Sequence, residues 1–133
     1  MKKPTVLIAD DESHIRVMLR KLVTKLGYTV VGEAADGMQA VEVFKNKMPD
    51  IVLLDIIMPI KSGEIVLKEI VEYAPGTCVI MFSCISDEQT MKICMEFGAA
   101  GYIKKETPLS EVDGIIHRIW NTFNSLKYMA MEA

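Results

Sequence analysis

The sequence predicts an α/β domain in which a parallel five-stranded sheet is covered by helices on both faces. Three runs, residues 6–9, 51–54 and 78–82, are short and apolar throughout, which is typical of strands buried on both faces. Two less continuous candidates, residues 28–34 and 101–104, are expected nearer the sheet edges. Amphipathic segments follow each run, so five strand–helix units alternate strictly. Right-handed crossovers then favour a doubly wound open sheet.

Start and stop signals mark the helical segments. Gly27 can end the first helix in a left-handed conformation, and Asp36 can cap the second, which must end before Pro49. Proline is favoured in the first turn of a helix, so Pro108 opens the last one. The five helices are expected over residues 15–26, 36–48, 62–74, 87–97 and 107–126.

Composition predicts one soluble domain. The chain has 133 residues, and we expect a domain over residues 1–126 and a frayed tail over 127–133. A net charge of −3 argues against direct nucleic-acid binding. No segment approaches the roughly 18 apolar residues of a membrane span. The three cysteines have no metal-ligand spacing, which favours reduced thiols and a cytoplasmic location.

Polar residues stand where the predicted strands end. Asp10 and Asp11 follow the first strand, Asp55 the third and Ser83 the fourth, while lysines close the fifth. Helix capping or turn formation explains most such residues taken singly. Asp55 is different, because it lies among apolar neighbours, where a charge needs a partner or a metal. Function concentrates at the carboxyl ends of such sheets, so we expect these side chains to converge.

The expected cluster has a definite chemistry. Carboxylates that lie together repel one another unless a positive group joins them. Oxygen ligands suit Mg²⁺, and a lysine ammonium offers a second positive charge. Such a site can hold a transferring phosphoryl group. An aspartate is already ionised at pH 7, so Asp55 needs no general base to attack phosphorus.

At this point the sequence resembles the receiver domains of bacterial response regulators, and in size the single-domain chemotaxis regulators. The resemblance covers residues 4–126. It rests on the acidic pair Asp10-Asp11, Asp55 followed by Met58-Pro59 and Gly63, Ser83, Gly98-Ala99 with Gly101-Tyr102, and Lys105. The resemblance implies a flavodoxin-like fold with strand order 2-1-3-4-5. It also implies a signalling switch that catalyses only its own phosphorylation and slow dephosphorylation, and is not otherwise an enzyme.

The resemblance also implies a role for each site residue. Asp55 would become an aspartyl phosphate. Asp11, Asp55 and the backbone carbonyl of Ile57 would bind Mg²⁺, with Asp10 acting mainly through water. Ser83 and Lys105 would contact phosphoryl oxygens, and Tyr102 would rotate inward as the switch. Lys105 is assigned rather than Lys104 because it stands three residues after Tyr102.

The implied partners are a sensor histidine kinase or a histidine phosphotransfer protein, and a downstream protein of unknown identity. Phosphorylation would change the surface formed by the fourth helix, the fifth strand and the fifth helix. The protein would be a monomer or a phosphorylation-dependent dimer, with no membrane or direct nucleic-acid partner.

Two departures from the family pattern carry expectations. Glu106 replaces the proline that often follows the lysine, so we expect a trans Lys105–Glu106 bond. Ile57 and Ile85 are apolar at positions that flank the phosphoryl group, so no side chain there can orient water. We therefore expect slow hydrolysis of the aspartyl phosphate.

Other interpretations remain. The chain could be the receiver part of a longer DNA-binding transcription factor, or a binding module that works without phosphorylation. A phosphatase with an aspartate nucleophile would want a carboxylate where Ile57 stands, and a dinucleotide-binding fold would need a glycine-rich first turn. His14 and His117 lack ligand spacing and are interpreted as surface residues. The basic group Arg16, Arg20, Lys21 and Lys25 is interpreted as a solvated helix face.

Overall fold

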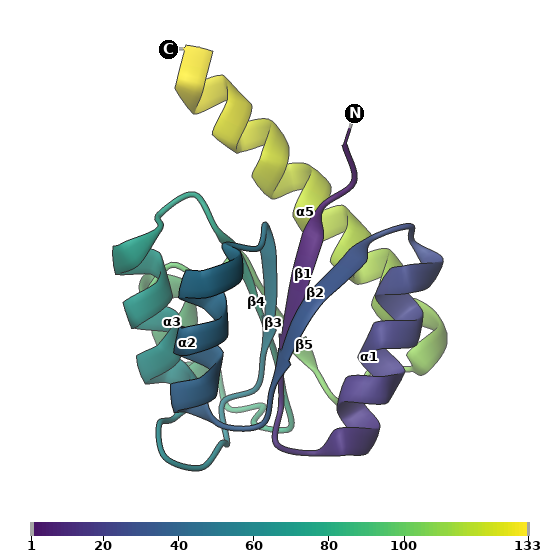
Figure 1. Ribbon diagram of the computed structural model, residues 1–133, viewed down its shortest axis with the longest axis vertical. Helices are drawn as coiled ribbons and strands as arrows, with labels where there is room; N and C mark the ends of the chain where they lie inside the picture. Colours follow the sequence, from purple (N-terminus) through teal and green to yellow (C-terminus); the bar gives the residue numbers. More distant parts are fainter. Residues whose placement is uncertain (1, 133) are drawn as a thin grey trace.

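Five strands and five helices alternate along the chain in the computed structural model, which describes residues 2–132. Figure 1 shows their arrangement. The strands are β1 (Thr5–Ala9), β2 (Thr29–Ala34), β3 (Ile51–Leu54), β4 (Cys78–Ser83) and β5 (Gly101–Lys104). The helices are α1 (Ser13–Lys25), α2 (Gly37–Lys47), α3 (Gly63–Tyr73), α4 (Glu88–Glu96) and α5 (Leu109–Glu132).

All neighbouring strands pair in parallel, in the order β2-β1-β3-β4-β5. The predicted fold class and strand order are therefore confirmed. β3 and β4 lie inside the sheet and are buried along their whole length, whereas the edge strands β2 and β5 are only partly buried. This difference explains why the central strands are continuous apolar runs in the sequence and the edge strands are not.

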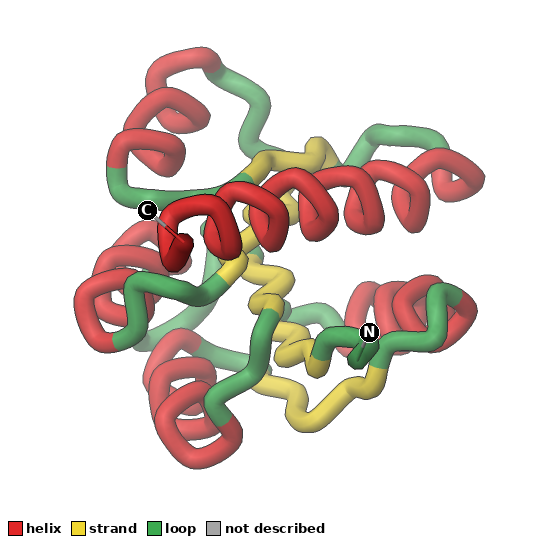
Figure 2. Tube along the Cα trace, turned by 90° about the horizontal axis from the view of Figure 1, so that it is seen from above, coloured by secondary structure: helices red, strands yellow, loops and turns green. Residues whose placement is uncertain are grey.

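The sheet separates two hydrophobic cores. Figure 2 shows the strands as a layer with helices on both sides. α2, α3 and α4 pack on one face around Phe44 and Leu67. α1 and α5 pack on the other face around Leu19 and Ile116. Because alternate residues of each strand enter opposite cores, every strand is anchored from both sides, and its carboxyl end is held in a defined place.

Local signals position the helix ends largely as predicted. The side chains of Asp36 and Asp87 accept the backbone N–H groups of Gln39 and Thr90, so both aspartates cap helices. Gly27, with φ of 86°, follows α1.

The expectation of a frayed tail over residues 127–133 was wrong for residues 127–132, because α5 continues to Glu132 and extends beyond the sheet (Figure 1). Residue 133 lies outside the described residues. Lys127, at the start of this extension, donates to the Gly76 carbonyl at 3.0 Å, and the residues beyond it have ordinary helix propensity. None of the described helices is both long and apolar enough to cross a membrane.

Candidate functional site

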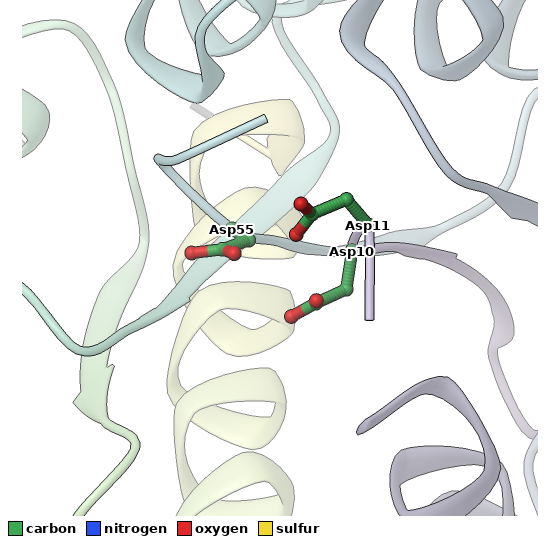
Figure 3. Close-up of side chains that lie close together, drawn as sticks. All are labelled: Asp10, Asp11 and Asp55. Atoms are coloured by element: carbon green, nitrogen blue, oxygen red, sulfur yellow. The ribbon is translucent and has the colours of Figure 1, made fainter. Parts of the chain in front are cut away.

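Three carboxylates meet at the carboxyl edge of the sheet. One oxygen from each of Asp10, Asp11 and Asp55 lies within 4.8 Å of the others, and Figure 3 shows the three side chains close together. Asp10 follows β1 and Asp55 follows the adjacent β3, and the N–H of Asp55 donates to the Ala9 carbonyl at 2.9 Å. The pairing of two adjacent parallel strands thus brings together side chains 45 residues apart in sequence.

Asp10 and Asp55 are buried, whereas Asp11 is exposed at the rim. Asp55 Oδ1 accepts its neighbour's N–H, that of Ile56, at 2.8 Å. Asp10 Oδ1 accepts the N–H of Glu12 at 2.9 Å. The second Asp10 oxygen, Oδ2, is buried without a hydrogen-bond partner among the described residues. Two carboxylates in this setting carry more negative charge than their backbone contacts neutralise.

Lys105 supplies the positive charge of the site. Its Nζ lies 3.0 Å from Asp10 Oδ2 and 3.1 Å from Asp55 Oδ2, although only the contact with Asp55 has hydrogen-bond geometry. Glu12 Oε1 approaches the same Nζ at 3.4 Å from the solvent side. Burial lowers the pKa of the Lys105 ammonium, but the carboxylates of Asp10 and Asp55 outweigh burial and hold that pKa above its ordinary value. Lys105 is therefore charged at neutral pH.

The electrostatic balance of the cluster still favours another cation. Burial raises the pKa of the Asp10 carboxyl, and the hydrogen bond from Glu12 and the ammonium of Lys105 only partly offset this rise. Among the described residues, one ammonium faces the three carboxylates, and Asp10 Oδ2 has the ion pair with Lys105 but no hydrogen bond. Hard oxygen donors in this number are the ligand set of a small divalent cation such as Mg²⁺. The residues present fit such an ion.

Ser83 and Tyr102 are linked to one another through the loop after β4. Ser83 is fully buried, and its Oγ accepts the N–H of Ile85 at 3.2 Å. The hydroxyl of Tyr102 donates to the carbonyl of Ile85 at 2.5 Å. Burial raises the pKa of the Tyr102 phenol. Ser83 also accepts the Lys105 N–H at its carbonyl, at 2.9 Å, so residue 85 and the end of β4 connect the acidic cluster to the half-buried tyrosine ring.

The remaining site residues predicted from the sequence lie at the rim. The Ile57 side chain is 55% exposed and offers no polar atom to the cluster, and Ile85 is partly buried. Among the described residues, it is Lys105 and not Lys104 that pairs with the acidic side chains. No described peptide bond is cis, so the bond between Lys105 and Glu106 is trans, as expected.

Sequence reasoning missed three residues around the cluster: Glu12, Arg16 and Glu33. Arg16 was expected on a solvated face, and that expectation was wrong. Its side chain is 19% exposed, and it contacts Asp10 and Glu33. No spacing rule connects Arg16 to Glu33, because the contact depends on how α1 lies against β2.

The two histidines lie on the surface, as expected. His14 and His117 are both exposed, and they lie on different helices. His117 Nδ1 is hydrogen-bonded to the hydroxyl of Tyr28 at 2.9 Å.

A doubly wound sheet of this strand order, with an acidic cluster and a lysine at its carboxyl edge, defines the class of phosphoacceptor switch domains. The family model for the response regulator receiver domain matches residues 6–117. The chain belongs to this family, and its general function is that of a phosphorylation switch in two-component signal transduction.

Individual proteins are similar over most of the chain. The chemotaxis protein CheY of Thermotoga maritima is 37% identical over 86% of this chain and 95% of its own length. A CheX-CheY-BeF3-Mg²⁺ complex from Borrelia burgdorferi contains a chain that is 36% identical, with a TM-score of 0.82 over 90% of this chain and 88% of that one. A putative transcriptional regulator of Pseudomonas aeruginosa is 36% identical over 80% of this chain, but the match spans 52% of that protein.

Proposed function

We propose that Asp55 is the phosphoryl acceptor of this switch and that the donor is a phosphohistidine on a separate kinase or phosphotransfer protein. The observation that carries the proposal is the buried carboxylate of Asp55, paired with Lys105 at 3.1 Å beside Asp10 and Asp11. For stability alone, apolar residues would serve better than a buried aspartate with an ammonium and two further carboxylates. The cluster therefore has no structural purpose. It does have a chemical one.

The proposed step is an in-line phosphoryl transfer. An Asp55 carboxylate oxygen attacks phosphorus, an O–P bond forms, and the N–P bond of the donor breaks, so that the imidazole leaves with the bonding electron pair and takes up a proton. Asp55 attacks as a carboxylate beside the Lys105 ammonium, so the step needs no general base. The contribution of the protein is positioning and electrostatic stabilisation of the transferring group.

A divalent cation completes the site in this proposal. Asp11, Asp55 and the backbone carbonyl of Ile57 would hold Mg²⁺ directly, and Asp10 mainly through water. The convergence of the three carboxylates supports this assignment, as does the similarity to the CheX-CheY-BeF3-Mg²⁺ complex from Borrelia burgdorferi. When bound, Mg²⁺ neutralises charge that develops on the phosphoryl oxygens.

Phosphorylation redistributes the contacts of two side chains. The new group carries a charge near −2 and three acceptor oxygens. Lys105, which already contacts Asp55 Oδ2, is placed to pair with one of them. Ser83, whose Oγ accepts the N–H of Ile85, carries a hydroxyl hydrogen that it can donate to another of these oxygens.

The signal then travels through residue 85. Movement of Ser83 towards the phosphoryl group changes the loop to which both Ser83 and Tyr102 are bonded. The Tyr102 hydroxyl leaves the Ile85 carbonyl, the ring turns inward, and the surface of α4, β5 and α5 changes. That surface binds a downstream protein target or a second phosphorylated copy. The protein catalyses only its own phosphorylation and slow dephosphorylation.

The alternative, the receiver part of a DNA-binding regulator, is favoured by one observation: the similar Pseudomonas regulator is about twice the length of the match. In that case the same switch would control an attached domain.

The test is the intact mass of the protein after incubation with acetyl phosphate and Mg²⁺. We expect a gain of one phosphoryl group in the wild type and in Asp50→Ala, whose site is at the other end of β3, but none in Asp55→Ala. A gain that persists in Asp55→Ala would overturn the assignment. Hydrogen exchange of the phosphorylated protein then tests the switch, because protection should change in α4 and β5 and not in α2.

A further inference from the structure

Asp10 is held by three hydrogen bonds, two at its backbone and one at its side chain, and one of the two backbone bonds comes from the side chain of another residue. Its N–H donates to the Ala34 carbonyl of β2 at 3.0 Å. Its Oδ1 accepts the N–H of Glu12 at 2.9 Å. Its carbonyl accepts a hydrogen bond from Arg16 Nη1 at 2.6 Å. The only polar atom of Asp10 that none of these bonds uses is Oδ2, which lies in the acidic cluster.

Arg16 is itself fixed by a carboxylate on a neighbouring strand. Its Nε donates to Glu33 Oε1 at 3.2 Å, while Arg20 binds the other oxygen of the same carboxylate. Glu33 lies on β2 opposite Ile8 of β1. The two arginines differ in burial, since the Arg16 side chain is 19% exposed and that of Arg20 is 49% exposed. Of these two arginines, only Arg16 also donates a hydrogen bond to the backbone carbonyl of Asp10.

We propose that Arg16, held by Glu33, is a positioning residue for the divalent-cation site: it fixes the carbonyl of Asp10 and with it the loop that carries Asp10 and Asp11. The inference rests on the proposed function, because it assumes that these carboxylates bind Mg²⁺. A planar guanidinium can bond a carbonyl and a carboxylate at once in fixed directions, which a lysine ammonium cannot do with equal rigidity. Groups that orient metal ligands in this way commonly alter metal affinity when they are removed.

For Arg16, charge alone predicts the opposite change in Mg²⁺ affinity from positioning, so the direction of the change tests the inference. Two guanidinium groups face one carboxylate here, so Arg16 adds positive charge beside a site that binds a cation. If Arg16 acted only through its charge, its removal would strengthen Mg²⁺ binding. If Glu33 acted only through its charge, its removal would weaken binding. Positioning requires both removals to weaken it.

The experiment measures Mg²⁺ affinity by calorimetry in the full chain. Arg16→Met keeps length and helix propensity but loses both hydrogen bonds, and we expect it to weaken Mg²⁺ binding by about tenfold. Glu33→Gln should weaken binding by a smaller factor, and the double variant should match Arg16→Met. Arg20→Met, the matched control, removes the same charge from the same carboxylate without touching Asp10, and should leave affinity within about twofold.

A second readout needs no metal. In the metal-free protein, Arg16→Met should speed hydrogen exchange in the segment 10–12, and Arg20→Met should not. Stronger Mg²⁺ binding in Arg16→Met, cancellation in the double variant, or equal exchange in the two arginine variants would overturn the inference. If the wild type failed to bind Mg²⁺ or to accept a phosphoryl group, the proposed function would fail instead. The exchange measurement would still show whether Arg16 holds the segment 10–12 in place.

Discussion

Replacing Asp10 with asparagine should stabilise the metal-free protein, although it removes a site residue. The side chain is buried, and within residues 2–132 its Oδ2 has the ion pair with Lys105 but no hydrogen bond. Asp55 carries a second buried carboxylate close by. Asparagine keeps the oxygen that accepts the Glu12 N–H and removes the charge. The Lys105 ammonium then pairs with Asp55 alone.

The magnitude follows from the distances. At an effective dielectric constant of about 20, attraction between Lys105 and Asp10 across 3.0 Å is about 5.5 kcal/mol. Repulsion from Asp55 across 4.8 Å or less is at least about 3.5 kcal/mol. Burial of an ionised carboxylate costs several kcal/mol more. The unfavourable contributions exceed the attraction by about 1–2 kcal/mol, which we expect as the gain in unfolding free energy. The raised pKa of Asp10 points the same way.

Urea unfolding without divalent cations, at pH 7, measures this gain. The pH dependence checks its origin. Folding raises the pKa of the Asp10 carboxyl above its unperturbed value of 3.8. Protonation of Asp10 therefore contributes its full stability below pH 3.8, and this stability is lost as the pH rises through the folded pKa. The advantage of Asp10→Asn should therefore shrink as the pH falls.

Asp50→Asn is the control, because the Asp50 carboxylate already accepts two hydrogen bonds from Thr5 and should gain nothing. A loss of stability in Asp10→Asn, or a gain that does not depend on pH, would refute this account.

Three further predictions concern the segment from the end of β3 to the start of α3. Ile57→Asn should shorten the lifetime of the phosphorylated protein, measured as decay of its phosphoryl mass, because an amide can orient water; decay of the wild type within seconds would argue against this reasoning. Ile60→Asn should raise the unfolding free energy by about 1 kcal/mol, because Ile60 has φ of 73° and is 74% exposed; unchanged urea stability would contradict it. Gly63→Ala should lower stability by about 3 kcal/mol, because its Cβ would lie 2.0 Å from the Asp55 carbonyl oxygen. Its control, Gly114→Ala, has open space around it in α5 and should instead raise stability by about 0.5–1 kcal/mol in the same assay.

Much of the site was predictable because strand ends are local features of the sequence. Buried parallel strands are apolar runs, their carboxyl ends share one edge, and Asp55 stood out as a charge among apolar residues. The fold class, the strand order and the convergence of Asp10, Asp11 and Asp55 followed from pattern and resemblance together. The fold class and the convergence follow from the strand pattern and from crossover handedness, whereas the strand order was implied only by the resemblance to receiver domains.

Contacts between elements were decided by the tertiary structure alone. The hydrogen bond from Arg16 to the Asp10 carbonyl depends on the rotation of α1 against β2. Nothing in the spacing of Arg16 and Glu33 encodes that rotation. The link from Ser83 through Ile85 to Tyr102 depends on the path of the loop after β4. The extension of α5 to Glu132 was missed because the sequence after Leu126 has no residue that signals where the helix ends. Periodicity specifies which face of an element is buried, whereas packing determines which side chain each polar group meets.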